Sequence, residues 1–240
     1  MNFSKKNHEF NKTKFNLMSK KIILLFLVTM SINVFAQKEV KEGVMAMKMT
    51  MSSDNEQVNA SLAMMGDMAM TIYFKENKSR SEMTNPMAGS TTTIVDNTSK
   101  KTLVLMDNAG GKNYMLTDID TSEESLKGLT ITSRKDTKTI AGYICKGYDI
   151  VGKKEGAEIN MTLYATDKIT APNQNTASFG TKIKGTPMHM IMNMKQMGMD
   201  MKITMEITEV KGESVADSKF DMKVPEGYTK MEMPKPANVD

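Results

Sequence analysis

The chain has 240 residues, of which 40% are hydrophobic and 25% are charged. The formal net charge is +4 at pH 7, but the first 36 residues hold this excess, and 26 basic and 27 acidic residues remain beyond them. A nearly neutral main part excludes the basic footprint of proteins that bind nucleic acid or anionic membrane surfaces. The single cysteine excludes an internal disulfide, and the remaining length is enough for one domain with one core.

The first 36 residues have the pattern of an export signal. Lys20 and Lys21 precede an apolar stretch, residues 22–35, which is followed by the small side chain of Ala36. A positive region, a short apolar region and a small-residue site are the parts of a secretory signal peptide. The apolar stretch is shorter than the roughly 20 residues that a membrane-spanning helix needs. We therefore predict cleavage at Ala36/Gln37, export to the periplasm or the cell exterior, and no transmembrane span after processing.

Apolar and polar residues alternate with a period of two along most of the remaining chain. In the run from Met199 to Thr208, methionine or isoleucine occupies each odd position and a polar residue each even one. This period puts the apolar side chains of a strand on one face. Strands are predicted around residues 44–51, 67–74, 80–84, 91–96, 101–106, 113–117, 129–133, 143–151, 159–164 and 199–208. Short turns join them, so the predicted fold is mainly β (α+β), an antiparallel sheet that curls.

Helical content is predicted to be small. Thr121 and Glu124 fit a capping box and Gly128 can end the helix, which gives about two turns. The acidic side chains of Asp54 and Glu56 are interpreted as solvated groups of a loop or cap. Residues 171–185 are polar and predict a loop.

The predicted organisation is one folded domain between two extensions. A signal peptide covers residues 1–36, with Met18 as an alternative start. A single β domain covers residues 37–228, and residues 229–240 form an extended tail. The prolines from Pro225 onward predict that this end frays.

The densest feature of the sequence is a methionine-rich hairpin. A four-residue loop over residues 195–198, with Gly198 at a positive φ, pairs Met194 with Met199. The same register pairs Met192 with Met201, Met190 with Ile203 and Met188 with Met205. Both strands then contribute to one continuous face of thioethers. The candidate ligand-lining residues are Met188, Met190, Met192, Met194, Met199, Met201, Ile203 and Met205.

Three interpretations of this face remain open. It can be packed core, because methionine fills irregular gaps, or an apolar groove for a lipid or acyl chain, because flexible thioethers adapt to varied shapes. It can also be a soft-metal site, because thioethers select Cu(I) or Ag(I). His189 lies by parity on the opposite face and cannot easily join such a site. The metal interpretation therefore uses Met190, Met192, Met199 and Met201.

No sequence motif predicts an enzyme or a bound cofactor. The chain lacks Gly-x-Ser-x-Gly, P-loop, His-Glu-x-x-His and Cys-x-x-Cys patterns. Cys145 alternates with Tyr143 and Gly147 and has no activating neighbour, which predicts a buried free thiol. His189 has no visible nucleophile or orienting partner. We therefore expect a non-enzyme.

Two segments resemble known sequences. Residues 139–148, Thr-Ile-Ala-Gly-Tyr-Ile-Cys-Lys-Gly-Tyr, resemble a recurring segment in a family of secreted bacterial domains of unknown function. Residues 220–228, Phe-x-x-x-Val-Pro-x-Gly-Tyr, are similar to the terminal strand of that family and to the periplasmic lipoprotein carriers LolA and LolB. The order of features agrees over most of residues 37–228. The resemblance implies an unclosed β half-barrel, a curved antiparallel sheet over a few helices, whose concave side holds acyl chains.

Together these features predict an exported periplasmic binding module. Its concave, methionine-lined surface would hold a hydrophobic ligand, which would be a lipid or a lipidated partner protein. One alternative is a methionine-rich protein that binds Cu(I) or Ag(I). Another is a structural or envelope-stress protein that holds no small ligand.

Overall fold

The structure is a computed structural model that describes residues 39–122, 124–154, 157–173, 179, 182–196 and 199–231. The described residues form one compact unit. The predicted leader and its cleavage site, and residues 232–240 of the predicted tail, lie outside the described residues. Within the described part, no helix is both long and apolar enough to cross a membrane.

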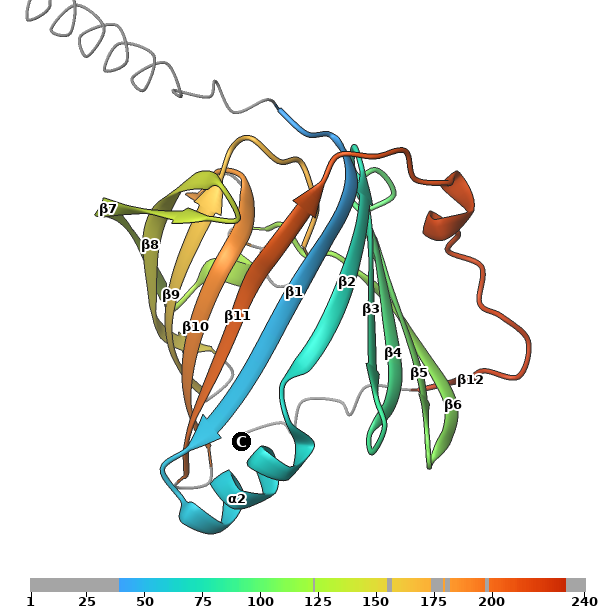
Figure 1. The fold of residues 1–240 in the computed structure, drawn as a ribbon, viewed down its shortest axis with the longest axis horizontal. Helices are drawn as coiled ribbons and strands as arrows, with labels where there is room; N and C mark the ends of the chain where they lie inside the picture. Colours follow the sequence, from blue (N-terminus) through green and yellow to red (C-terminus); the bar gives the residue numbers. More distant parts are fainter. Residues whose placement is uncertain are drawn as a thin grey trace, which may run out of the picture. The chain divides into compact units, whose positions relative to one another are not determined.

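Twelve strands form a single curved sheet that is open, with β12 at one edge and β7 at the other (Figure 1). The order across the sheet is β12-β6-β5-β4-β3-β2-β1-β11-β10-β9-β8-β7. Neighbours pair antiparallel, except that β12 runs parallel to β6. The predicted mainly β fold, an open and curved antiparallel sheet, is confirmed. The strands are β1 (Glu42–Ser53), β2 (Met68–Lys75), β3 (Lys78–Asn85), β4 (Gly89–Asp96), β5 (Lys101–Asn108), β6 (Gly111–Asp118), β7 (Leu129–Ile140), β8 (Tyr143–Lys154), β9 (Ala157–Thr166), β10 (Thr186–Gln196), β11 (Met199–Lys211) and β12 (Thr229–Lys230).

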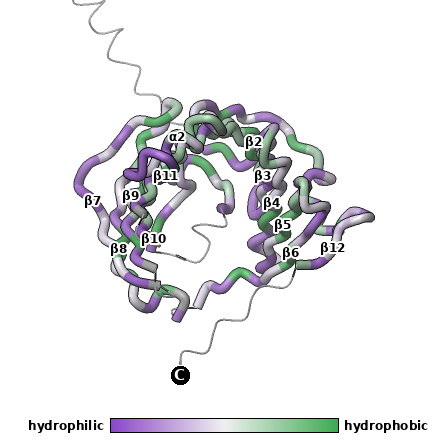
Figure 2. The backbone as a smooth tube through the Cα atoms, turned by 90° about the horizontal axis from the view of Figure 1, so that it is seen from below, coloured by the Kyte–Doolittle hydropathy of each residue, from purple (hydrophilic) through white to green (hydrophobic). Residues whose placement is uncertain are grey.

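Strand β1 joins two meanders into this sheet. It pairs with β2 on one side and with β11 on the other, so β2–β6 and β7–β11 extend in opposite directions from it. Successive strands twist in one sense, and over twelve strands the sheet curls into an arc. Figure 2 shows this arc as a ring, in which the chain passes from β6 to β7 by a connection, residues 119–128, instead of a pair of bonded strands.

The C-terminal segment covers the outer face of β3–β6 as a strap. Residues 212–231 include the short 3-10 helix η3 (Asp217–Phe220) and end at β12 (Figure 1). The side chains of Met222, Val224 and Tyr228 pack on a core cluster of Ile94, Leu103 and Leu105. These three strand residues therefore face outward, and residues of the opposite parity face inward.

The chain was expected to fray from Pro225 onward. This expectation is wrong for residues 225–231, which are held in place. Tyr228 packs on the outer cluster, and β12 pairs with Asn113 and Tyr114 of β6. The backbone N–H of Met231 also donates to the Tyr114 carbonyl oxygen at 2.8 Å. Apolar contacts and backbone hydrogen bonds to β6 thus fix the segment from Pro225 to Met231, although its local sequence predicts a frayed end.

The helical predictions need two corrections. The α-helix α2 (Glu56–Met65) was not predicted, although Asp54 and Glu56 are exposed at its start, as expected for a loop or cap; Asn55 caps it by accepting backbone N–H bonds at 3.0 and 3.1 Å, and Gly66 ends it. The predicted two-turn helix after Thr121 is only a 3-10 turn, η1 (Glu124–Leu126). Too few residues lie between its start and β7 for a helix to propagate beyond its nucleus.

The β10–β11 hairpin has a register two residues away from the predicted one. Strand β10 continues through Gln196, so the predicted loop over residues 195–198 is wrong, and Lys195 forms an ion pair with Asp200 at 3.9 Å. A shift of two residues leaves each side chain on its original face. The predicted common face therefore survives, although the partners change. The observed pairs are Met194 with Met201, Met192 with Ile203, Met190 with Met205 and Gln196 with Met199.

Candidate functional site

The inner face of the sheet carries methionines on both sides of β1. Residues that lie opposite each other in antiparallel strands project to the same face. The pairings define two long rows across β1, β2 and β11. One row contains Met190, Met205, Met49 and Met68, and the next contains Ile207, Met47, Met70 and Met83.

At the end remote from α2, the chain itself fills this face. In the connection between β9 and β10, Ile169 and Ala171 belong to the core cluster of Met45 and Phe74, and Phe179 and Ile183 belong to that of Leu163 and Met190. The Ser79 hydroxyl on β3 donates to the Pro172 carbonyl oxygen at 2.6 Å, which ties the connection across the sheet. The remaining space beside Met47, Met188, Met190 and Met205 is about 10 Å³, close to the volume that one water needs. This end is packed core.

Toward α2, the same face is half-buried on β1, β10 and β11, whereas Met68 at the start of β2 is buried. Along β10, Met190 is 2% exposed whereas Met192 and Met194 are half-buried, and along β1 the change comes between Met47 and Met49. The half-buried side chains of this region form a continuous apolar patch across β3, β2, β1, β11 and β10. We name it the methionine surface: Met49, Met51, Met70, Met83, Met192, Met194, Met201, Ile203 and Met205.

The structure divides the predicted lining residues between these two regions. Met188 and Met190 lie in the core clusters. Five lie on the methionine surface, namely Met192, Met194, Met201, Ile203 and Met205. The backbone of Met199 pairs with Gln196, and its side chain lies outside the described part.

Sequence reasoning missed the contribution of β1, β2 and β3 to this surface. The alternation over residues 44–51 and 67–74 revealed the strands and their apolar faces. The pairing of β1 with β11 is a contact between residues some 150 positions apart along the chain, and no local signal specifies it. Only that pairing makes the methionines of the first strands continuous with the hairpin.

The described side chains of the predicted metal ligands differ in burial and position. Met190 is buried, and Met201 lies opposite Met194, diagonal to Met192. His189 projects to the outer face, as its parity predicted. Among the described residues, no three His, Cys, Asp or Glu side chains gather to hold a metal ion.

A hollow of about 480 Å³ lies at the α2 end of the hairpin, and both polar residues and the methionines Met194 and Met201 line it. Asn193 and Lys202, opposite each other in β10 and β11, contribute to it from the face opposite Met192. The Asp200 N–H donates to Asp54 Oδ1 at 3.0 Å, and the Ser53 hydroxyl donates to the Asp200 carbonyl oxygen at 3.0 Å. These bonds fasten the junction between β1 and α2 to the tip of the hairpin.

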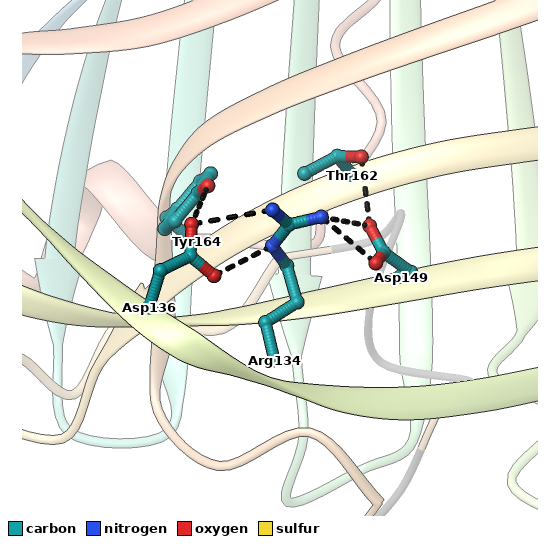
Figure 3. A network of polar contacts seen from close by, with 5 residues as sticks. All are labelled: Arg134, Asp136, Asp149, Thr162 and Tyr164. Carbon is teal, nitrogen blue, oxygen red and sulfur yellow. Dashed lines mark hydrogen bonds and ion pairs between the residues drawn. The ribbon is translucent and has the colours of Figure 1, made fainter.

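A second polar cluster lies on the outer face, around Arg134 in the bulged part of β7 (Figure 3). The Arg134 guanidinium donates to both oxygens of Asp149 at 2.9 and 2.8 Å and to Asp136 at 2.8 and 3.2 Å. The Tyr164 hydroxyl donates to Asp136 at 2.8 Å, and the Thr162 hydroxyl donates to Asp149 at 2.9 Å. We name these five residues the Arg134 network. It links β7 to β8 and β9.

Three titratable groups of β7, β8 and β10 have shifted pKa values. Hydrogen bonds from Arg134, and then from Tyr164, lower the pKa of Asp136 to about 2. Burial raises the pKa of Cys145 to about 11, so its thiol is protonated and a poor nucleophile at neutral pH. The predicted free, buried thiol is confirmed. Burial and the Lys138 ammonium lower the pKa of His189, against a smaller opposing effect of Glu206, so the imidazole is neutral at pH 7.

No curated protein is significantly similar in sequence to the chain. A solved structure described as MucB in complex with MucA(peri) is similar with a TM-score of 0.39 and 9% identity. The match covers 76% of this chain, but only 54% of that chain, so the present sequence spans about half of the relative.

The family comparison covers most of the described sheet. The matching model is described as "Domain of unknown function (DUF4412)", and it aligns with residues 41–228. This range begins just before β1 and ends at the Tyr228 that packs on the outer cluster. The chain therefore belongs to the DUF4412 family.

Proposed function

We propose that this chain is an exported binding module, not an enzyme, and that its methionine surface holds a hydrophobic ligand, such as the acyl chain of a lipid or of a lipidated protein. One observation carries the proposal. The connection between β9 and β10 covers one end of the inner face and the strap covers the outer face of β3–β6. The residues of the methionine surface, toward the other end of the inner face, stay only half-buried.

The chemistry of this surface suits a ligand of variable shape. Methionine side chains are unbranched and polarizable, so they adjust to different chains without a fixed pocket. Burial of apolar surface supplies about 0.8 kcal/mol per methylene group, hence about 8 kcal/mol for ten methylenes before the costs of association. Export, which would bring the module to envelope lipids, rests on the leader pattern of residues 1–36.

The described polar groups support binding in preference to catalysis. The donors of the Arg134 guanidinium are engaged by two carboxylates, and the raised pKa of Cys145 leaves it protonated. Arg134 lies in its network on the outer face, and Cys145 is fully buried in a core cluster. An enzyme would need an activated nucleophile or an acid–base pair beside its ligand.

Charge placed on the methionine surface tests the proposal. We expect the double variant Met192→Asp/Met201→Asp to bind a fluorescent fatty acid at least tenfold more weakly, because each carboxylate must lose water when the chain binds. Asn193→Asp is the matched control, since Asn193 is exposed on the opposite face of the same strand. Fluorescence titration measures both affinities, and native mass spectrometry of protein purified from its own envelope should show bound lipid. Equal affinity in wild type and double variant, or a wild-type chain that binds no fatty acid, would refute the proposal.

A further inference from the structure

We infer that four thioethers on β1, β2 and β3 form a binding site for a soft monovalent metal ion, Cu(I) or Ag(I). We name this group the β1–β3 thioether cluster: Met49, Met68, Met70 and Met83. It differs from the group that the sequence suggested, since it uses none of the hairpin methionines. It also goes beyond the proposed function, because it requires sulfur and not merely an apolar surface.

The register brings these four side chains together. Met49 lies opposite Met68 across β1 and β2, and Met70 lies opposite Met83 across β2 and β3. Directly opposed Cβ atoms are about 4.5–5.5 Å apart and diagonal neighbours about 7–8 Å apart. Each sulfur lies two flexible bonds beyond its Cβ, so the sulfurs of opposed or diagonal neighbours can reach one ion, with Met68 and Met70 on β2 between Met49 on β1 and Met83 on β3.

The surroundings of the cluster favour a soft ion that is partly shielded from water. Met49, Met70 and Met83 are half-buried, which leaves a path from solvent, whereas Met68 is 6% and the neighbouring Met47 7% exposed. The residue opposite Met83 on β4 is Thr91, a neutral hydroxyl. Thioethers select Cu(I) over harder ions, and an apolar shell around them limits competition from water.

The hairpin offers a poorer arrangement for the same ion. Met190 lies in the core cluster of Leu163, and Ile203 stands opposite Met192, so one opposed pair of half-buried thioethers is left, Met194 and Met201. The β1–β3 thioether cluster has two adjacent opposed pairs. Because these two groups of methionines lie on different strands, an experiment can test where the ion binds as well as whether thioethers bind it.

Titration with Ag(I), and with Cu(I) under a reductant, tests the inference on the full mature chain. The background is Cys145→Ala, which removes the buried thiol as a competing ligand. We expect Met49→Leu/Met70→Leu/Met83→Leu to weaken Ag(I) and Cu(I) binding at least tenfold. The control Met192→Leu/Met194→Leu/Met201→Leu should change the affinity less than threefold. Leucine keeps the apolar surface, so both triple variants should still bind the fluorescent fatty acid, which separates this test from that of the proposed function.

The pH dependence provides a second readout. Thioethers carry no proton, so the affinity for Ag(I) should stay constant between pH 7 and pH 5, whereas imidazole and thiolate sites lose affinity on acidification. Circular dichroism confirms that the variants are folded. No tight Ag(I) binding in the Cys145→Ala chain, a loss confined to the hairpin variant, an equal loss in both triple variants, or no loss in either would each overturn the inference. A steep fall in the affinity for Ag(I) as the pH is lowered from 7 to 5 would also overturn the inference.

Discussion

Gly147 on β8 leaves no room for a side chain on the outer face of the sheet. An added Cβ would lie 2.8 Å from Arg134 Cδ, 3.0 Å from Arg134 Cβ and 3.1 Å from Tyr164 Cε1. These two residues belong to the Arg134 network. In the same segment, Ala141 and Gly142, with φ of 47° and 84°, form the turn between β7 and β8. The segment that resembled a family motif is thus explained by packing and turn geometry.

Substitution of this glycine should destabilise the fold. In Gly147→Ala, Arg134 must move away and weaken its bonds to two carboxylates, and overpacking of this kind costs about 1–3 kcal/mol. Gly212→Ala is the control, because the nearest atom to its added Cβ, Val40 Cγ1, lies at an ordinary 3.5 Å. Urea denaturation measures the free energy of unfolding of both variants. Equal stability of the two would show that the contact around Gly147 carries no packing constraint.

The strap is the element whose role was hardest to foresee from local sequence. Its η3 segment is fixed at several points: Lys219 Nζ lies 4.0 Å from the centre of the Tyr73 ring, Arg80 donates to the Lys219 carbonyl oxygen at 3.3 Å, and Phe220 is 4% exposed. The prolines and polar residues of the strap indicate an extended path correctly. Its docking depends on an outer apolar face of β4 and β5 that becomes recognisable only once the sheet has formed.

Truncation of the buried anchor of the strap tests this role. We expect Phe220→Ala to lower the free energy of unfolding by about 3–5 kcal/mol, the usual cost of removing a buried phenylalanine ring. Met231→Ala, at a residue 44% exposed beyond β12, should change it by less than about 0.5 kcal/mol. Chemical denaturation measures both. A small effect of Phe220→Ala would mean that the sheet does not need the strap for stability.

Among the elements of the fold, the strands could be predicted from the local sequence, whereas several of the connections between them could not. Period-two alternation is a local signal, so it located β1, β2, β9 and β11 and the faces of their described methionines. The helix α2 depends on the cap at Asn55, a signal available in the sequence but hidden beside a charged loop pattern. The hairpin register was two residues off, because alternation fixes parity and leaves even shifts undetermined.

For the molecule as a whole, the arrangement follows from the central position of β1. Its pairing with β11 joins two meanders, and their apolar faces become one inner surface. The candidate site was therefore half predictable: the hairpin methionines came from sequence, and Met49, Met70 and Met83 came from long-range pairing. Equally, no local pattern predicted that the connection between β9 and β10 would cover Met188 and Met190 while leaving Met192 and Met194 half-buried.

The central claim is that the methionine surface, and not the core or the exposed rim, receives the ligand. Its most direct test is a fatty-acid titration of protein labelled with ¹³C at the methionine methyl groups, followed by NMR. We predict that the methyl signals of Met49, Met192 and Met201 shift together with one affinity. The signals of core residues Met45 and Met188, and of Met87, which is 72% exposed on the β3–β4 turn, should stay in place. Shifts confined to Met87 and other exposed methionines, or no shift at saturating fatty acid, would contradict the account.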